Sequence, residues 1–391
     1  MFKKISWNGL ESNFWKIWIY VFTNRRAYIT LLGIYFLTFP DNTVKQIGFY
    51  TALGSLVSFL FEIPSGYFSD RFGYKKTLIL AKIFMFLATL CFILGHNVFY
   101  FAVGSIFISL GFAFTSGTMA SFFHENLEEV GKGAFFTKIW GRIKGSVSLF
   151  NALLIIAIPF LTKISFELPF YVGLGVDIVG LLIAFCLVEP KREMKIEKPK
   201  NIVAVVKETK GSNFWPVVIF AVILYGISSS THSFRGPYLE SIGYPVAYIG
   251  FVMGLSRFVW FLVSRFVHKI EERFTIKKLF FIEIFVFSVT MFFVAFLKNP
   301  YIVGLFLSLM IGYYWGRESF VQNYIINTLP DKKYKATMLS VKVQLSNLLN
   351  LFLVFLLGYI MNYSYTVGFA FLALLLFVGL SISWIFVKCI K

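Results

Sequence analysis

Two adjacent ionisable residues, Arg317 and Glu318, lie inside a long apolar stretch and follow directly on Tyr313, Tyr314 and Trp315. A charged side chain at the centre of a membrane helix costs about 2.5–3.5 kcal/mol, so such a residue is a functional candidate by default. Aromatic rings beside an acid and a base could form one wall of a binding site, and Glu318 could carry a proton or a cation. These residue types predict the recognition of a solute.

Three further arginines lie in apolar stretches. Arg25 and Arg26 are adjacent, so on a helix their side chains point about 100° apart and at least one is expected to face an internal cavity. Snorkelling to lipid headgroups is one alternative for this pair, and a salt bridge to Glu318 is another. Arg257 could bind an anion or pair locally. Chiefly Glu318 opposes the charge of these three arginines and Arg317. The expected site is therefore net positive and suits an anionic, zwitterionic or amphiphilic small molecule.

Patterns typical of enzymes, metal sites and cofactor sites are missing from the sequence. The cysteines form no C-x-x-C pair, and no two histidines have metal-ligand spacing. There is no phosphate-binding loop, and Ser116-Gly117 is not a nucleophile elbow. We therefore expect no catalytic residue, no metal and no cofactor.

The composition is far more apolar than that of a soluble domain. Of 391 residues, 58% are hydrophobic and 14% are charged, whereas soluble domains are about 25% charged. A spanning helix needs about 20 apolar residues, and the long runs lack the alternation of a membrane barrel. The sequence predicts an all-α membrane protein with twelve transmembrane helices. The apolar stretches are 17–39, 46–68, 77–96, 98–122, 136–161, 168–188, 214–234, 246–267, 277–297, 300–325, 337–361 and 364–387.

Basic residues are distributed unevenly between the two ends of these stretches. With the N-terminus inside, the inner segments hold roughly 25 Lys and Arg, and the outer segments hold about four, namely Lys45, Lys163, Arg235 and Lys298. Topology and anionic lipid headgroups then account for the net charge of +18, so membrane lipids are expected partners and nucleic acid is not. We expect a monomeric, multi-pass inner-membrane protein with both termini in the cytoplasm.

The chain contains an internal repeat. At an offset of 202 residues, the segments 70–72 and 75–76 align with 272–274 and 277–278, and the apolar matches continue along the flanking spans. Polar turns that align at one shift are not expected by chance. The intervening polar segment contains two prolines and many charges, which is typical of a linker. We predict an N-terminal six-helix half at 1–188, a basic cytoplasmic linker at 189–213 and a C-terminal six-helix half at 214–391, related by a pseudo-twofold axis along the membrane normal.

The segment 66–76, GYFSDRFGYKK, resembles the G-x-x-x-D-R-x-G-R-K signature of the major facilitator superfamily. Together with the twelve spans and the repeat, the resemblance covers essentially the whole chain. It implies transport by alternating access between two rocking halves, with spans 1, 4, 7 and 10 lining the cavity. Three segments resemble bacterial members grouped with drug and metabolite exporters, which implies export; they are 62–66, 116–118 and 336–340.

The same resemblance assigns the signature to a cytoplasmic gate. Asp70 would lock the two halves together against span 11, while Gly66 allows close helix approach and Gly73 permits the turn before span 3. A bridge from Glu62 to Lys342 is expected to help close this gate. A solvated loop that follows the charge bias is the alternative. The gating candidates are Glu62, Gly66, Asp70, Arg71, Gly73, Lys75, Lys76 and Lys342.

We interpret the chain as a secondary transporter of a small molecule, with protons as a candidate coupling ion. Asp177 and Glu283 lie on spans that the family uses as outer supports, so local pairing is expected for both. One alternative function is a proton-coupled multidrug exporter of lipophilic cations that depends on Glu318. However, span 4 lacks the Arg and span 5 lacks the Gly-Pro pattern of many proton antiporters. A second alternative is a transport-inactive membrane sensor or scaffold that acts through the linker.

Overall fold

The computed structural model describes residues 9–191, 214–328 and 335–388, and every regular element in these ranges is a helix. The prediction of an all-α protein is confirmed. In the described ranges, nine helical stretches are long and apolar enough to cross a membrane, and a pair of helices bent by 50° would make a tenth. Most of the predicted linker and residues 329–334 lie outside the described residues.

Eight α-helices and four short 3-10 turns lie in the described residues before the linker. Two of the turns, Leu10–Ser12 and Gly133–Phe135, have three residues each. The main segments are α1 (Asn13–Thr23), η2 (Ala27–Leu31), α2 (Leu32–Leu37), α3 (Val44–Phe72), α4 (Tyr74–Leu94), α5 (Val98–Ser116), α6 (Thr118–Glu129), α7 (Phe136–Ala157), η4 (Ile158–Lys163) and α8 (Leu168–Cys186).

Seven α-helices follow the linker. The first two, α10 (Phe214–Ser230) and α11 (Arg235–Ser241), form the pair that is bent by 50°. The remaining five helices are long. Where the residues between two of them are described, a short turn connects the two helices. They are α12 (Ile249–Arg273), α13 (Ile276–Phe296), α14 (Pro300–Asn327), α15 (Lys335–Tyr363) and α16 (Tyr365–Lys388).

The first span of each half is interrupted. Predicted span 1 is divided between α1, η2 and α2, and residues 24–26 between α1 and η2 are not helical. Predicted span 7 (214–234) contains α10, and the bend at residues 231–234 leads into α11, which begins just beyond the predicted end. Predicted span 10 is α14, which is 28 residues long. All twelve predicted stretches therefore coincide with helical structure, which is consistent with the predicted number of spans.

The chain forms two compact units, which we describe separately. Unit 1 comprises Met1–Leu32 and Leu53–Lys198, and unit 2 comprises Gly33–Ala52 and Pro199–Lys391. Residues 33–52, which the sequence analysis placed in the N-terminal half, thus pack with the second unit. The close approach of Gly48 on α3 to Gly358 on α15 illustrates this packing, since an added Cβ at Gly48 would lie 2.6 Å from the Gly358 Cα.

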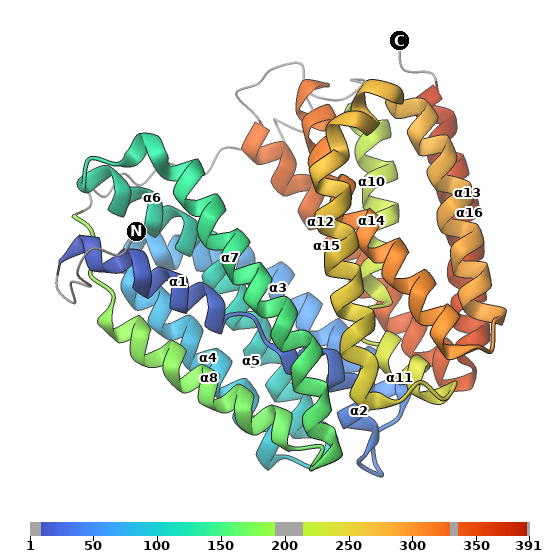
Figure 1. Cartoon of the computed structure of the whole chain (residues 1–391), viewed down its shortest axis with the longest axis horizontal. Coiled ribbons are helices and arrows are strands. Elements are labelled where there is room, and N and C mark those ends of the chain that lie inside the picture. The colour runs from blue at the N-terminus through green and yellow to red at the C-terminus, as the bar shows by residue number, and fades with distance from the viewer. Residues whose placement is uncertain (1–8, 192–213, 329–334, 389–391) are drawn as a thin grey trace. The chain divides into compact units, whose positions relative to one another are not determined.

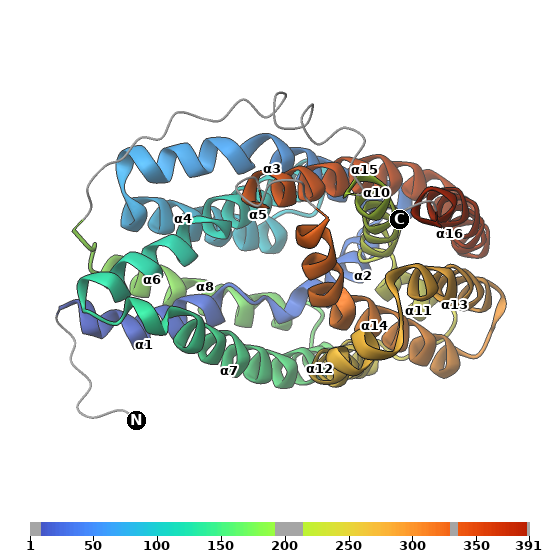
Figure 2. The same cartoon turned by 90° about the horizontal axis from the view of Figure 1, so that it is seen from above.

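In unit 1, α4 packs along α5 and α8, and α1 packs along α8 (Figures 1 and 2). Small residues make the α4–α5 contact close, because an added Cβ at Gly111 would lie 2.5 Å from the Met85 side chain. One core of this unit surrounds the start of α4 and the helix α6. Its side chains are aromatic and aliphatic, and Tyr20, Leu78 and Phe122 among them are fully buried. This packing brings α1, α4 and α8 together around the polar groups described below.

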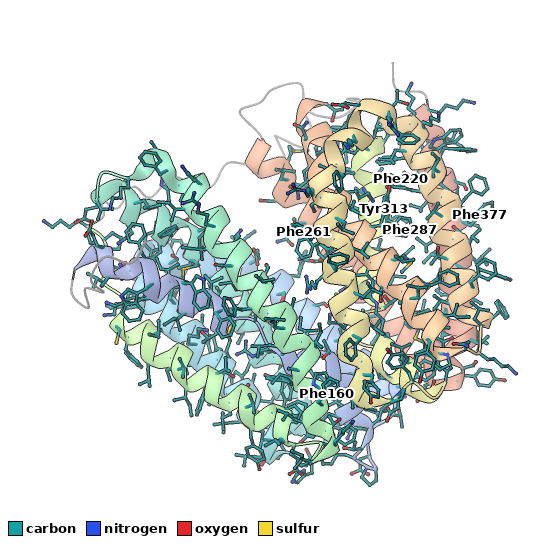
Figure 3. The ribbon with its side chains drawn as sticks, viewed as in Figure 1. Phe160, Phe220, Phe261, Phe287, Tyr313 and Phe377 are labelled. Atoms are coloured by element: carbon teal, nitrogen blue, oxygen red, sulfur yellow. The ribbon has the colours of Figure 1, made fainter. Side chains whose placement is uncertain are left out.

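In unit 2, α12 packs along α14, α13 along α16, and α10 along both α15 and α16 (Figures 1 and 2). Phe220 on α10 is buried and stacks on Phe280 of α13, with their ring centres 3.8 Å apart. By contrast, Phe261 on α12 and Phe377 on α16 are exposed (Figure 3). Exposed aromatic side chains on long apolar helices fit a lipid-facing surface.

Candidate functional site

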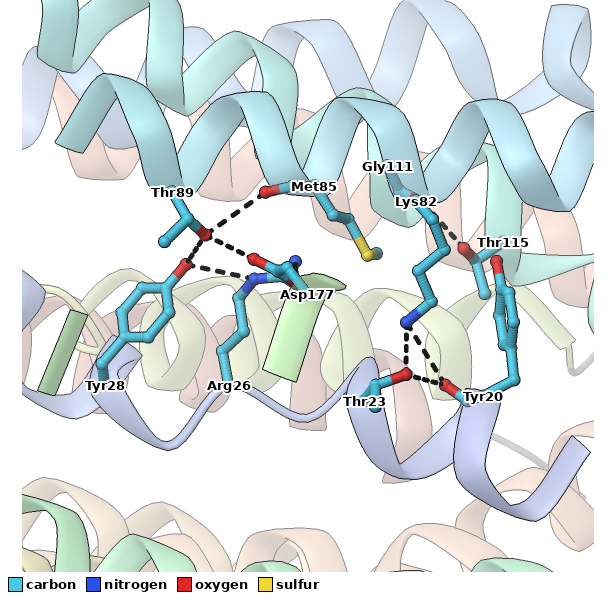
Figure 4. Close-up of polar contacts among 10 residues, drawn as sticks. All are labelled: Tyr20, Thr23, Arg26, Tyr28, Lys82, Met85, Thr89, Gly111, Thr115 and Asp177. Carbon is cyan, nitrogen blue, oxygen red and sulfur yellow. Dashed lines mark hydrogen bonds and ion pairs between the residues drawn. The ribbon is translucent and has the colours of Figure 1, made fainter. Parts of the chain in front are cut away.

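A buried ion pair joins the break in span 1 to α8. The Arg26 guanidinium donates to Asp177 Oδ1 at 2.5 Å and, through Nε, to the Tyr28 hydroxyl at 3.1 Å. Thr89 on α4 donates to Asp177 Oδ2 at 2.6 Å and lies 2.8 Å from the Tyr28 hydroxyl (Figure 4). Both charged side chains are about 98% buried or more, with exposures of 2% and 1%. Local pairing of Asp177 is confirmed.

Lys82 lies beside this pair and was missed in the sequence analysis. Its side chain extends from α4 to the end of α1, where Nζ donates to the Thr23 hydroxyl at 2.7 Å (Figure 4). The signal for it was available, because Lys82 is the charged residue in the middle of predicted span 3 and its counterpart at the repeat offset is Ile284. Arg25, Arg257 and Glu318 were selected because each is charged while its counterpart in the other half is not. The same criterion applies to Lys82.

A second buried ion pair lies in unit 2. Arg317 Nε on α14 is 2.9 Å from Glu283 Oε1 on α13, and each side chain is 1% exposed. The Tyr313 hydroxyl donates to the same Glu283 oxygen at 3.0 Å. Local pairing of Glu283 is confirmed. Arg317 and Tyr313, both predicted substrate-binding residues, therefore belong to a buried polar group between α13 and α14 (Figure 3).

The partners of Glu318, Lys342 and Glu62 differ from those expected. The Lys342 ammonium on α15 forms an ion pair with Glu318, which also accepts from Gln322 at 3.2 Å. The Glu62 carboxylate accepts from the Ser116 hydroxyl at 2.9 Å. Each of these acids therefore has a donor within its own unit. The bridge expected from Glu62 to Lys342 and the alternative bridge from Glu318 to Arg25 or Arg26 would join the two units, and both stay predictions.

Aromatic side chains of α10, α12 and α14 form a cluster next to these charges. The Tyr225 ring is 6.2 Å from both Tyr314 and Trp315, and Trp260 is 6.0 Å from Trp315, measured between ring centres. We call Tyr225, Trp260, Tyr314 and Trp315 the aromatic cluster. Its two edges carry positive charge, since the Arg317 guanidinium lies 5.4 Å from the Tyr314 ring centre and Arg257 lies 5.2 Å from that of Trp260.

The two neighbouring arginines of span 1 have different environments. Arg26 is buried in its ion pair with Asp177, whereas the side chain of Arg25 is exposed. The non-helical backbone at residues 24–26 explains why they diverge, because a helix would have set them only about 100° apart. Arg25 is therefore the exposed member of the pair.

The signature segment forms the end of α3 and the start of α4. Gly73, at φ +96° and ψ 156°, adopts a backbone conformation that is essentially restricted to glycine, as the predicted turn requires. The carboxylate of Glu189, just after α8, accepts from the backbone N–H groups of Tyr74 at 2.8 Å and Lys75 at 2.6 Å. Glu189 thus caps the N-terminus of α4, where backbone N–H groups lack partners within the helix.

The remaining signature residues lie on the surface of this turn. Asp70, Arg71 and Lys75 are exposed or half-exposed, and Arg71 lies 5.5 Å from the Phe72 ring centre. The expected close helix approach at Gly66 is not observed, because an added Cβ there would meet no described atom within 4 Å. Lys76 is likewise exposed. The turn geometry fits the signature, and the gating roles of these residues stay predictions.

Within 9–191, 214–328 and 335–388, no group of three or more His, Cys, Asp or Glu could hold a metal ion.

Arg235, expected in an outer loop, is instead buried at the start of α11 and donates to Thr231 and to the Ser228 carbonyl. Its donors satisfy the backbone and side-chain oxygens exposed by the break between α10 and α11. The site is thus built from buried ion pairs, broken helices and aromatic rings.

These features define a polytopic α-helical membrane protein that holds charged side chains inside its helix bundles, a class that includes the secondary transporters. The family model of the Major Facilitator Superfamily matches residues 19–342. The chain belongs to the major facilitator superfamily, and it is a membrane transporter rather than an enzyme.

Solved structures of similar fold agree with this assignment. The nucleoside transporter NupG has a TM-score of 0.77 at 13% sequence identity, with 98% of each chain covered. A mutant peptide transporter of the POT family in complex with sulfate has a TM-score of 0.74 at 12% identity, covering 97% of this chain and 95% of that one. A D-xylose–proton symporter has a TM-score of 0.71 at 15% identity, with 97% of each chain covered. At these identities the likeness concerns the fold alone. No curated protein sequence matches the chain significantly.

Proposed function

We propose that this chain is a secondary active transporter that moves an anionic or zwitterionic aromatic or amphiphilic solute across the inner membrane by alternating access. The observation that carries the proposal is the aromatic cluster with an arginine over each edge. Rings at these distances offer stacking surfaces, and Arg257 and Arg317 lie 5.2 Å and 5.4 Å from ring centres in it. A planar solute with a negative group would satisfy both features.

Arg317 adds a hydrogen-bonding argument. It forms an ion pair with Glu283, and none of its three guanidinium nitrogens has a hydrogen-bond partner among the described residues. Buried donors in native proteins are usually satisfied, and an arginine fork matches a carboxylate or phosphate. These donors favour a solute with such a group, in keeping with the net positive site expected from the sequence.

The direction of transport is proposed to be export. Its support is the resemblance of segments 62–66 and 116–118 to exporter-like members, and not the solved structures of similar fold, whose names include a D-xylose–proton symporter. Uptake into inside-out membrane vesicles, compared with uptake into intact cells, tests it. Export predicts accumulation in the vesicles under an imposed gradient. Accumulation confined to intact cells would contradict it.

The substrate class is tested by thermal stability of the purified protein with three indoles of similar size but different charge. Indole-3-propionate is anionic, tryptophan is zwitterionic and tryptamine is cationic. A ligand that binds only the folded state stabilises it by about 2.7 kcal/mol at a concentration of 100 Kd. We expect stabilisation by the anion or the zwitterion, and its loss in Trp315→Ala and Arg257→Gln. Phe377→Ala, which removes an exposed ring on α16, is the matched control and should retain the response.

The cationic probe decides between the proposal and the multidrug alternative. Stabilisation by tryptamine alone, abolished by Glu318→Gln, would contradict an anionic substrate and favour the exporter of lipophilic cations. In this structure Glu318 is already paired with Lys342, so a cationic solute would have to displace that ammonium. This competition is why we favour the anionic class.

A further inference from the structure

Lys82 occupies an unusual place for a membrane lysine. Its side chain is 0% exposed, with Nζ 2.7 Å from the Thr23 hydroxyl, 3.4 Å from the Tyr20 carbonyl oxygen and 4.4 Å from the centre of the Tyr20 ring. Gly180 on α8 leaves room for it, because an added Cβ there would lie 2.8 Å from this nitrogen. Asp177, the nearby carboxylate, is engaged by Arg26, and no described carboxylate forms an ion pair with Lys82.

The oxygens around the Lys82 amine belong to the break in span 1. The helix α1 ends at Thr23, so the carbonyls of its last turn are not all used by the helix. Half-helix C-termini and unwound carbonyls in transporters hold coupling cations or protons. Here the protein itself supplies an amine, that of Lys82. It is surrounded by the Tyr20 carbonyl, the Thr23 hydroxyl and the Tyr20 ring.

The neighbouring charges leave this amine without a balancing anion. Among the described residues, Arg26 and Asp177 are the charged groups whose fields reach Lys82, and the Tyr20 ring centre lies 4.4 Å from its Nζ. Since Arg26 and Asp177 neutralise each other, a protonated Lys82 adds one unmatched positive charge to the bundle. Such a charge is strongly disfavoured without a partner, and release of a proton removes it.

The Thr23 contact accommodates both states of the amine. A threonine hydroxyl can accept a hydrogen bond from an ammonium group, and it can equally donate one to the lone pair of a neutral amine. The hydroxyl now donates to the Tyr20 carbonyl at 2.9 Å and can turn to Nζ by rotation about one bond. The site therefore holds its geometry whether or not Lys82 carries a proton.

We propose that Lys82 is the proton-binding residue of this transporter, loading and releasing a proton at the break in span 1 as α1, α4 and α8 change their packing. This inference rests on the proposed function, because only a transporter would couple such a proton to movement of a solute. Arg26 and Asp177 act as a fixed neutral pair that sets the environment of the amine. Glu318, paired with Lys342 in unit 2, is not needed for this step.

The test is a potentiometric difference titration of purified wild-type protein against Lys82→Met in detergent, which needs no substrate. We expect the wild type to take up one proton more than the variant between about pH 9 and pH 5, the range in which a proton gradient can load and unload a site. Lys298→Met, which removes an exposed loop lysine, is the control and should take up as many protons as the wild type over this range.

Lys82→Arg separates a proton carrier from a structural cation. Arginine keeps the charge and does not release a proton in this range, so the extra proton should disappear as it does in Lys82→Met. Thr23→Val, which keeps Lys82 and removes the hydroxyl, should retain one proton but move its midpoint by about one pH unit or more. If Lys82→Met fails to fold, Thr23→Val still tests whether Lys82 binds the proton. A wild type that titrates like Lys82→Arg across this range would overturn the proposal.

The titration and the indole screen fail independently. An extra proton on Lys82 together with no response to any indole would count against the proposed substrate class alone. A selective response to the anionic indole together with no extra proton would leave the transport proposal intact and remove Lys82 from it.

Discussion

At the scale of single residues, the two buried arginine–carboxylate pairs are the main internal charges of this transporter. Removing two charges from water costs several kcal/mol per ion, and only close contact with further hydrogen bonds compensates. Asp177 has both, since Arg26 and Thr89 each donate to it at 2.6 Å or less. Such pairs are weak evidence for net stability, but a pair that loses one partner leaves a costly buried charge.

Asp177→Asn should therefore destabilise the protein by about 3–5 kcal/mol, because Arg26 would remain buried without its carboxylate. Thermal unfolding in one detergent measures the loss. Arg26→Met together with Asp177→Leu should recover a large part of it, since neither charge then remains. Glu128→Gln is the control, as its contact with His124 is exposed and should matter little. Equal losses in the single and double variants would contradict the argument.

Residue type and depth were sufficient to select several charged positions from the sequence, but not their partners. Arg26 and Arg317 were candidate substrate-binding residues, and their carboxylate partners Asp177 and Glu283 lie far away in sequence. Which acid reaches which base depends on how helices pack, and a single sequence does not contain that information. Lys82 was missed although the repeat criterion applies to it, since its counterpart at the repeat offset is Ile284.

At the scale of elements, periodicity and length located the helices well because long apolar runs in lipid have few alternatives to a helix. The break at residues 24–26 was not predicted, although Asn24, Arg25 and Arg26 interrupt the apolar run there, because the residues on both sides were interpreted as one span. The Arg26–Asp177 pair forms at this break, and Lys82 contacts the Thr23 hydroxyl and the Tyr20 carbonyl at the end of the helix before it. The first-span interruptions in both halves place buried arginines, Arg26 and Arg235, next to unwound backbone.

The turn between α3 and α4 gives an element-scale prediction from two glycines of one motif. Gly73→Ala should destabilise the protein by about 1–3 kcal/mol, because φ +96° with ψ 156° is strained for a residue with a side chain. The new Cβ would also lie 3.2 Å from Glu189 Oε1, disturbing the cap on α4.

Gly66→Ala is the matched control for this change. It lies within α3, where no described atom would meet its Cβ within 4 Å, so the substitution should be neutral or stabilise by about 0.5–1 kcal/mol. Thermal unfolding of both variants under the same conditions compares them. If the two variants shift the transition alike, the strain assigned to Gly73 is wrong.

At the scale of the whole molecule, the repeat and the signature were enough to predict the superfamily fold, which the family match confirms. The boundary between compact units was harder, because residues 33–52 pack with the second unit through contacts such as Gly48 with Gly358. The composition of a sequence reveals a linker, but it does not reveal that residues 33–52 pack with the second unit. The fold also leaves the orientation in the membrane to be tested, since only the distribution of Lys and Arg predicts it.

That orientation gives a prediction for the intact protein. With both termini in the cytoplasm, the loop holding Lys298 faces outward, and the end of α12 holding Glu272 faces inward; both residues are exposed. After replacement of the native cysteines, a cysteine at position 298 should react in intact cells with a maleimide that does not cross membranes. A cysteine at 272 should react only after the cells are opened. The positive-inside bias predicts this result because basic loops are retained on the cytoplasmic side. The reverse labelling pattern would invert the topology and with it the assignment of the signature turn to a cytoplasmic gate.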